Sequence, residues 1–243
     1  VRPFKLQRPR ASFGFYFRED RLPKRFLPHG IPVHQVLAMY RDMAEHGHNS
    51  GWFYPGGDYT QGKCHVVNDL LPLAQQAGML DPNVPIITCG MDPTLASIAW
   101  LEAECTRRGW PEMTTYAYDE PPYPSDAVRE RCRAIRTFPQ RTASAISSLK
   151  AAYGHCDLID VQLILGGVVT TEMKAEAKRQ GVDLWTYSYS ILREGFLPYR
   201  QRFYAGFYTW AHQLKGNFPW AYYDNHHSHA WFAPGKDEPL PVT

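Results

Sequence analysis

Eight short runs of β-branched and aromatic residues alternate along this chain with longer segments of helical periodicity. Runs of this composition, bounded by Gly, Pro, Asn and Ser, are typical of β-strands. They occupy residues 13–17, 50–55, 84–90, 114–120, 142–147, 158–165, 184–190 and 219–225. Strands that alternate with helices predict a parallel sheet, and eight such units predict an α/β fold of the (β/α)8 TIM-type barrel class.

The helical segments lie between these strands and end at turn-forming residues. Gly181 and Gly216 follow two of them and are interpreted as C-terminal caps. Gly206, inside the last segment, is expected to allow close contact between helix and strand. Residues 226–243 are turn-rich, which predicts a barrel that lacks its last helix or closes in another way. The expected helices cover residues 33–46, 93–108, 125–136, 170–180 and 199–214.

Composition limits the classes of function. The chain has 243 residues and a formal net charge of +2, so we expect one catalytic barrel domain over residues 1–243, either whole or excerpted from a longer protein. A nearly balanced charge argues against a nucleic-acid partner. No apolar run is long enough to span a membrane, so no membrane partner is expected. Secreted, periplasmic and cytoplasmic locations all stay open.

Cysteine and histidine positions do not predict a metal site. The five cysteines are widely spaced and form no CxxC pair, so buried thiols are expected. His226, His227 and His229 lie close together, but no further ligand follows from the spacing, and we interpret them as loop residues. We therefore expect no metal and no organic cofactor.

Two adjacent carboxylates, Asp119 and Glu120, end the fourth expected strand, and Pro121 and Pro122 follow directly. In a barrel of this class the functional face is formed by the C-terminal ends of the strands. Pro121 favours an extended Glu120 and stops further strand pairing. Neighbours in a regular strand point to opposite faces, so both acids reach one pocket only if the strand end kinks or bulges.

Paired carboxylates beside one sugar bond are typical of glycoside hydrolysis. The seventh expected strand carries no acid, and the nearest one, Glu194, follows it in a loop. Three hypotheses remain open on the residues alone. The substrate's own 2-acetamido group acts as nucleophile beside Asp119 and Glu120, or a distant residue such as Glu194 does so, or the barrel binds carbohydrate without turnover.

Aromatic residues make up 14% of the chain, and Tyr and Trp offer a flat apolar face and a polar group to a sugar ring. Asn49 is interpreted as a turn residue and Asp160 as a buried acid with a partner in the barrel. For each aromatic candidate, packing between barrel and helices is the alternative. The candidate substrate-binding residues near strand ends are Tyr54, Tyr118, Tyr187, Tyr189, Trp220, Tyr222 and Asp224.

Three segments carry a family resemblance: YAYDEPP at 116–122, DLWTYSYS at 183–190 and RFYAGFYTWAHQLKGNFPWAYYD at 202–224. Together they resemble the catalytic barrel of glycoside hydrolase family 123, whose members are retaining β-N-acetylgalactosaminidases. The resemblance extends from about residue 13 to the C-terminus. It implies that Asp119 orients the acetamido group and stabilises an oxazolinium intermediate, and that Glu120 acts as general acid and then as base.

The same resemblance implies the binding partners. The substrate would be a glycan or glycoconjugate with β-linked N-acetylhexosamine, and GalNAc is favoured. It also implies an additional β-sandwich domain or an oligomer partner beside the barrel.

Overall fold

A computed structural model describes residues 11–14, 16–17, 33–53, 66–88, 95–121, 125–154, 157–165, 169–187 and 203–219. Its strands form one sheet in the order β1-β9-β8-β7-β6-β5-β4-β3-β2, and every neighbouring pair is parallel. The strands are β1 Ser12–Phe13, β2 Tyr16–Phe17, β3 Trp52–Phe53, β4 Ile86–Thr88, β5 Met113–Asp119, β6 Arg141–Ile146, β7 Val161–Leu165, β8 Asp183–Tyr187 and β9 Gly216–Asn217.

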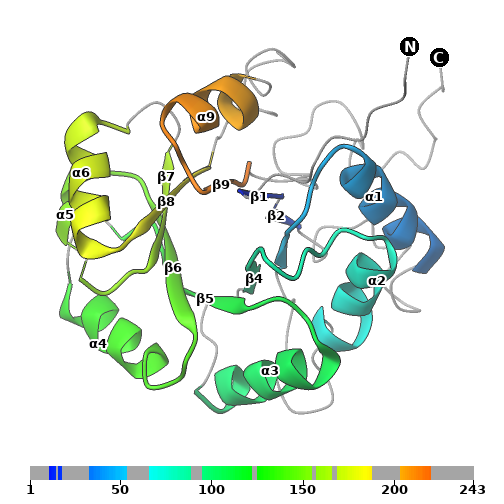
Figure 1. Cartoon of the computed structure of the whole chain (residues 1–243). Helices are drawn as coiled ribbons and strands as arrows, with labels where there is room; N and C mark the ends of the chain where they lie inside the picture. The colour runs from blue at the N-terminus through cyan, green and yellow to red at the C-terminus, as the bar shows by residue number, and fades with distance from the viewer. Residues whose placement is uncertain are drawn as a thin grey trace, which may run out of the picture.

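The sheet curls so that its two ends meet on one segment of chain. Strand β1 pairs with β9 and strand β2 pairs with β3, while only residues 14–15 separate β1 from β2. Helices surround the strands in Figure 1. The fold is therefore α/β, a curled parallel sheet of the (β/α)8 TIM-barrel type, as the alternation of strands and helices predicts.

The helices follow the strands in sequence and cover the outer side of the sheet (Figure 1). Ser125 caps α4 by accepting a hydrogen bond from the Val128 backbone N–H at 3.3 Å. Gly181 ends α6 in the left-handed conformation, with φ of 71°, so its predicted role as a cap is confirmed. The helices are α1 Val33–Glu45, η3 Val66–Leu70, α2 Leu71–Gln76, α3 Leu95–Arg108, α4 Asp126–Ile135, α5 Leu149–Gly154, α6 Thr171–Gln180, η4 Phe203–Tyr208 and α9 Thr209–Ala211.

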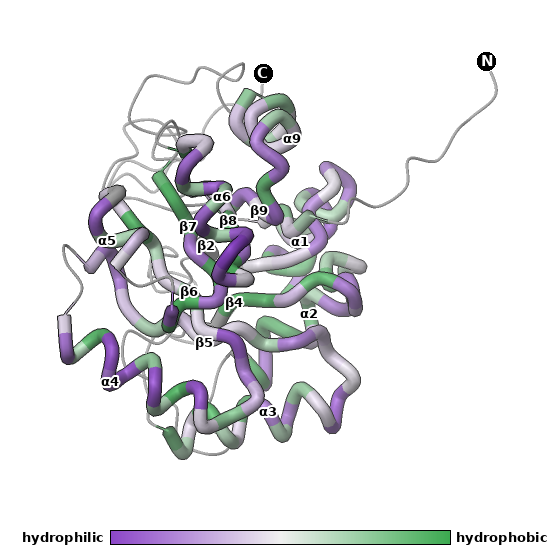
Figure 2. The backbone as a smooth tube through the Cα atoms, turned by 60° about the vertical axis from the view of Figure 1, so that its left-hand side comes forward, coloured by the Kyte–Doolittle hydropathy of each residue, from purple (hydrophilic) through white to green (hydrophobic). Residues whose placement is uncertain are grey.

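Buried apolar residues lie on both sides of the curled sheet. Figure 2 shows hydrophobic colour on β4, β6 and β7 and an alternation of hydrophilic and hydrophobic residues along α4, as expected of a helix with one face on the sheet. Two clusters fill the space between strands and helices. A third, here called the interior cluster, consists of Ile87, Tyr116, Ala143, Ala145, Val161, Leu163, Trp185, Tyr187 and Phe218.

Several sequence predictions are wrong in detail. Gly216 is not a helix cap but the first residue of β9, where a Cβ would lie 2.5 Å from Trp185 Cδ2. Gly206 makes no close helix–strand contact, since a Cβ there would meet nothing within 4 Å. The last helical segment ends at Ala211, earlier than expected. The strand expected at 219–225 is preceded by β9 at Gly216–Asn217, and residues 220–225 lie outside the described part of the chain.

Two cysteines are buried thiols, as predicted. Burial raises the pKa of Cys105 to about 12 and that of Cys132 to about 11. Cys64, Cys89 and Cys156 lie outside the described residues. No helix in the described part of the chain is long and apolar enough to cross a bilayer.

Candidate active site

A β-bulge in β5 turns the predicted acid pair toward the barrel interior. Tyr116 pairs with Ala143 of β6, but Asp119 pairs with Ala145, so three steps along β5 match two along β6. Ala117 is the extra residue of this bulge. Regular alternation from Tyr116 would place Asp119 on the outer face, whereas the extra residue aligns it with Ala145 of the interior cluster. The irregularity that a shared pocket requires is therefore present.

Side chains from two neighbouring elements bind the backbone of this bulge. Arg131 of α4 donates from Nε to the Ala117 carbonyl at 3.1 Å. Ser144 of β6 donates its hydroxyl to the Tyr118 carbonyl at 2.5 Å. Backbone groups that leave a regular ladder need other partners when they are buried, and these contacts supply them. These side-chain hydrogen bonds thus stabilise the bulge, which is not a frayed strand end.

Asp119 lies at the C-terminal end of β5, and its carboxylate accepts a hydrogen bond from the Tyr116 hydroxyl. Tyr116 is only 2% exposed and belongs to the interior cluster. The phenol therefore holds the carboxylate at the rim of the barrel interior, while the residue as a whole stays accessible to solvent.

Glu120 leaves the strand in the left-handed region, with φ of 41°. The extended conformation predicted from Pro121 is therefore wrong at this position. A positive φ is unusual for a residue with a side chain, and such strain is found mainly where other contacts enforce it. Here the Tyr187 hydroxyl donates a hydrogen bond to Glu120 Oε1. Strands β6 and β7 separate β5 from β8 in the sheet, so this contact spans the barrel interior.

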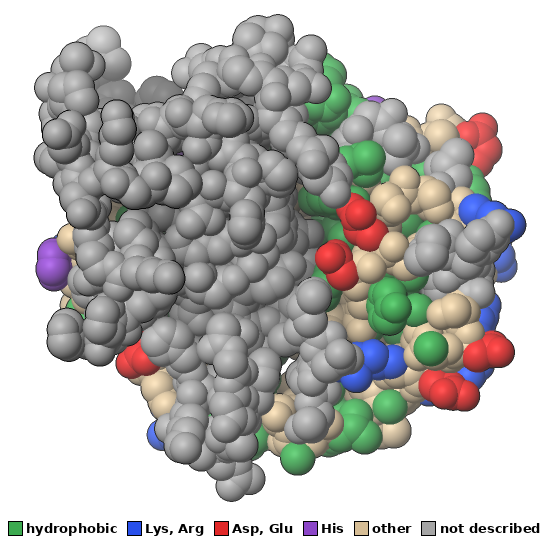
Figure 3. Space-filling view, turned by 180° about the vertical axis from the view of Figure 1, so that it is seen from behind, with side chains coloured by type: hydrophobic (Ala, Val, Ile, Leu, Met, Phe, Trp, Pro, Cys, Tyr) green, Lys and Arg blue, Asp and Glu red, His purple; other side chains and the backbone are tan. Residues whose placement is uncertain are grey.

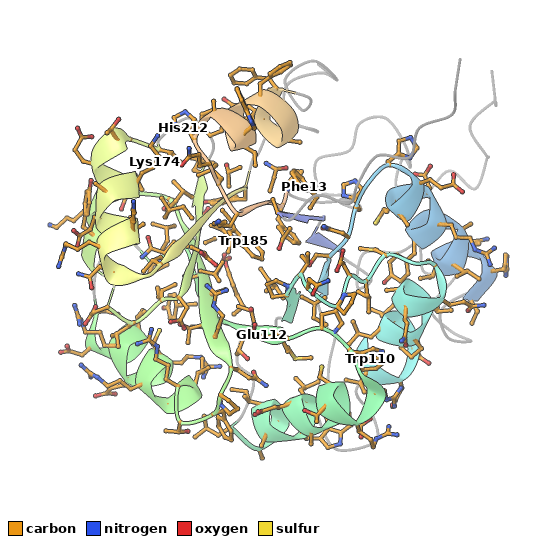
Figure 4. All side chains as sticks on the ribbon, in the orientation of Figure 1. Phe13, Trp110, Glu112, Lys174, Trp185 and His212 are labelled. Carbon is orange, nitrogen blue, oxygen red and sulfur yellow. The ribbon has the colours of Figure 1, made fainter. Side chains whose placement is uncertain are left out.

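The two carboxylates thus contact hydroxyl groups of one interior cluster. Tyr187 is 4% exposed and ends β8, as Asp119 ends β5, so the site lies at the C-terminal ends of the strands. This is the functional face of TIM barrels. One layer deeper, Trp185 fills the interior and stacks on Phe218 with ring centroids 5.1 Å apart. Figure 4 shows Trp185 within the ring of strands, with Lys174 and His212 toward the outer layer.

The other candidate binding residues are placed only in part. Tyr118 pairs with Ser144, between inward-facing Ala143 and Ala145, so its ring is on the opposite side of the strand from Asp119. It is 45% exposed, and its contact with a sugar stays a prediction. The remaining candidates, Tyr54, Tyr189, Trp220, Tyr222, Asp224 and the alternative nucleophile Glu194, lie outside the described residues, as do His226, His227 and His229.

Asp160 lies at the opposite, N-terminal edge of the sheet, just before β7. Its carboxylate accepts hydrogen bonds from the Thr142 N–H and hydroxyl, both at 2.8 Å, and pairs with Arg136. Burial raises the pKa of Asp160, but the bonds from Thr142 and Arg136 outweigh it and hold the pKa below its ordinary value. The acid has partners, as expected, but it precedes β7 and is only half-buried, so the prediction of a buried acid within the strand is wrong. Its place at the N-terminal edge favours a structural role.

Asn49 also has a structural position. Its side-chain oxygen accepts from the Phe13 N–H at 2.8 Å, and its amide donates to the Ala11 carbonyl at 3.0 Å. These bonds join the loop before β3 to β1. This agrees with a loop residue and not with a ligand contact.

Tyr116 contacts the acid pair although no local sequence pattern predicts a role for it. The only indication in the sequence is the alternation along β5, which is consistent with an inward-facing residue 116 directly before the extra residue Ala117. Sequence alone does not reveal which position of a strand contains a bulge, so this role emerged only from the register.

The described surface carries charged groups of both signs. Among residues 11–219 that the structure describes, no group of three or more His, Cys, Asp or Glu side chains is arranged to hold a metal ion. Where described side chains are visible in Figure 3, acidic, basic and hydrophobic groups are mixed.

Comparison with known proteins supports the fold and no single activity. No protein-family model matches the chain, and no curated protein matches it. Similar solved structures include DHDPS from Cyanidioschyzon merolae with lysine bound, at 11% identity over 86% of this chain and 69% of that one, TM-score 0.53. A putative mandelate racemase from Bordetella bronchiseptica RB50 is 12% identical over 96% and 56% of the chains, TM-score 0.52.

A third similar structure is that of ScGas2 in complex with a compound. It is 11% identical over 82% of this chain and 52% of that one, with a TM-score of 0.50. The chain thus spans about half the length of the racemase and of Gas2. These neighbours have diverse activities and are 11–12% identical to this chain, so they establish the TIM-barrel fold and no particular activity.

Proposed function

We propose that this chain is a retaining glycoside hydrolase acting on β-linked N-acetylhexosamines by substrate-assisted catalysis. One observation carries the proposal. Adjacent residues Asp119 and Glu120, which would diverge in a regular strand, are both hydrogen-bonded to tyrosines of one interior cluster. Two carboxylates at one sugar supply the two functions that this reaction needs, an amide-orienting base and a general acid.

Asp119 accepts a hydrogen bond from the acetamido N–H and turns the amide carbonyl oxygen toward the anomeric carbon. That oxygen attacks C1 as the bond from C1 to the leaving oxygen breaks, and Glu120 gives its proton to the leaving oxygen. The product on the enzyme is an oxazolinium, whose positive charge Asp119 stabilises. Glu120 then takes a proton from water as the water attacks C1, which regenerates the amide and retains the anomeric configuration.

The strand ends around the acid pair favour a nucleophile from the substrate. Strands β6, β7 and β8 end in Ile146, Leu165 and Tyr187, none of which is a carboxylate. Retaining glycosidases that form a covalent intermediate need a second carboxylate about 5 Å from the acid. A pair of directly adjacent acids is better suited to orienting a substrate amide and protonating its leaving group.

The family resemblance indicates which N-acetylhexosamine is the preferred substrate. Segments 116–122, 183–190 and 202–224 resemble glycoside hydrolase family 123, and this favours GalNAc over other N-acetylhexosamines. The first of these segments contains the acid pair. The second contains Tyr187, which bonds Glu120.

Initial-rate assays with aryl β-GalNAc, aryl β-GlcNAc and aryl β-galactoside test the proposal. We expect turnover of the acetamido sugars only. Asp119→Asn and Glu120→Gln should each lower kcat by about 10²- to 10⁴-fold, the usual contribution of such groups. With a more acidic phenol as leaving group, the Glu120→Gln loss should shrink, because protonation is then needed less.

Glu112→Gln is the matched control. Glu112 is exposed and directly precedes β5, at the opposite end of the strand from the acid pair. It should keep the wild-type rate. Equal hydrolysis of the galactoside would exclude the acetamido mechanism and favour a protein nucleophile, whereas sugar binding without turnover would favour a carbohydrate-binding barrel.

A further inference from the structure

We propose that Tyr116 is a positioning residue that orients Asp119 toward the substrate amide. The β5 bulge makes this possible, because it brings both side chains to the inward side of the strand. This inference rests on the proposed function for its catalytic consequence. Its structural part, that the phenol selects the orientation of the Asp119 carboxylate, stands on the contacts alone.

The hydroxyl oxygen of Tyr116 is bound to the backbone of the neighbouring strand. Because Ala117 is an extra residue, the register between β5 and β6 shifts between Ala143 and Ser144, and Asp119 pairs with Ala145. The Ala145 backbone N–H donates to the Tyr116 hydroxyl oxygen at 3.2 Å. The hydroxyl oxygen of Tyr116 is thus held by a backbone group of the sheet, which fixes its position.

A phenol hydroxyl has one proton to donate. With its oxygen accepting from Ala145, Tyr116 directs that proton to Asp119 Oδ1. The Ala145 N–H therefore donates to the Tyr116 oxygen, and the Tyr116 O–H donates to the Asp119 carboxylate. Tyr116 is 2% exposed, so bulk water does not compete for its hydroxyl.

Tyr116 is expected to restrict the orientation of the Asp119 carboxylate, because Tyr116 is buried and Asp119 is exposed. Asp119 is exposed at the barrel rim, where a carboxylate has several accessible rotamers. The bond from a buried, sheet-anchored hydroxyl favours the rotamer that points inward. Because Tyr116 itself is almost inaccessible, it acts through Asp119 and not by touching the sugar.

Tyr116→Phe tests this with the ring retained and both bonds removed. We expect kcat on aryl β-GalNAc to fall about 10- to 100-fold, the scale of a displaced catalytic group, with little change in KM. An interaction that acts only in the transition state lowers kcat and kcat/KM equally. The matched control is Tyr208→Phe, since the buried Tyr208 hydroxyl also accepts a backbone N–H, from Val169 at 3.3 Å. It should keep the wild-type kcat.

A double-variant comparison separates positioning from general destabilisation. If Tyr116 acts through Asp119, adding Tyr116→Phe to Asp119→Asn should cause no further loss of kcat, because interacting sites are not additive. Multiplying losses in the double variant would overturn the positioning role.

Crystal structures of the wild type, Tyr116→Phe and Tyr208→Phe give a readout that does not depend on activity. The Asp119 side chain should keep one inward rotamer in the wild type and in Tyr208→Phe and adopt others in Tyr116→Phe. An unchanged rotamer in Tyr116→Phe would overturn the inference even in an active enzyme. A changed rotamer in a protein that hydrolyses no hexosaminide would instead refute the proposed function and leave the structural role of Tyr116 intact.

Discussion

Replacing Gly216 by alanine should destabilise the barrel through one identifiable clash. The added Cβ would lie 2.5 Å from Trp185 Cδ2, 2.8 Å from Cε3 and 2.9 Å from Cγ. These distances are too short for carbon atoms, whose optimal separation is about 3.5–4.0 Å. Trp185 is 1% exposed and stacks on Phe218 at an interplanar angle of 11°, so it cannot move without disturbing the interior cluster.

The size of the effect follows from the cost of overpacking a core. An inserted methyl group that forces side-chain or backbone shifts costs about 1–3 kcal/mol of unfolding free energy. For a domain of this length, 1 kcal/mol corresponds to about 2–4 °C in Tm. Gly216→Ala should therefore lower Tm by about 2 to 12 °C, measured by circular dichroism during heating.

Gly206→Ala is the matched control because the same change is made where there is room. A Cβ at Gly206 would meet nothing within 4 Å, and the residue lies in the helical segment η4. Alanine is favoured over glycine in a helix by up to about 1 kcal/mol, so Tm should stay constant or rise. If Gly216→Ala melts at the wild-type temperature, or if both variants shift Tm equally, the steric argument is wrong.

Three further changes test other parts of the structure. Tyr187→Phe removes the donor to the carboxylate that forms as Glu120 gives up its proton. It should lower kcat by about tenfold or more, since bonds to charged groups contribute about 1.5–3 kcal/mol. An unchanged kcat in steady-state assays would contradict this role of Tyr187. Burial, assisted by the charge of a neighbouring histidine, lowers the pKa of His48 from 6.5 to about 4. The unfolded chain therefore binds more protons between these values, and stability should fall as pH decreases from 6.5 to 4. Urea titrations over that range should show a weaker pH dependence for His48→Gln, and an equal slope would contradict this. Asp160→Asn should cost about 1–3 kcal/mol in urea unfolding by weakening the bonds with Thr142, yet leave kcat per folded molecule unchanged.

The helices and strands with strong local signals were predictable from the sequence. Ser125 and Gly181 begin and end helices because the cap geometry depends on nearby residues only. Strands β5, β6 and β7 coincide closely with the β-branched and aromatic runs. The errors occur where local signals are ambiguous. Gly216 was taken for a cap, since sequence does not show that Trp185 would lie against it.

The helical segment over residues 66–76 was missed for a related reason. Its first turn, η3, is a π-helix, and α2 begins with Leu71 and a proline, so helical periodicity is weak there. Its burial against α1 and α3 in one apolar cluster stabilises it. Tertiary packing and not propensity therefore decides this segment.

The sequence by itself determined the alternation of strands and helices and the position of Asp119 and Glu120 at a strand end, because both follow from local residue order. Only the tertiary structure decided that the two acids face one interior. That outcome depends on an extra residue in the register with β6, on a left-handed Glu120, and on hydroxyl groups from Tyr116 and Tyr187. These contacts join strands far apart in the chain, so no local pattern contains them.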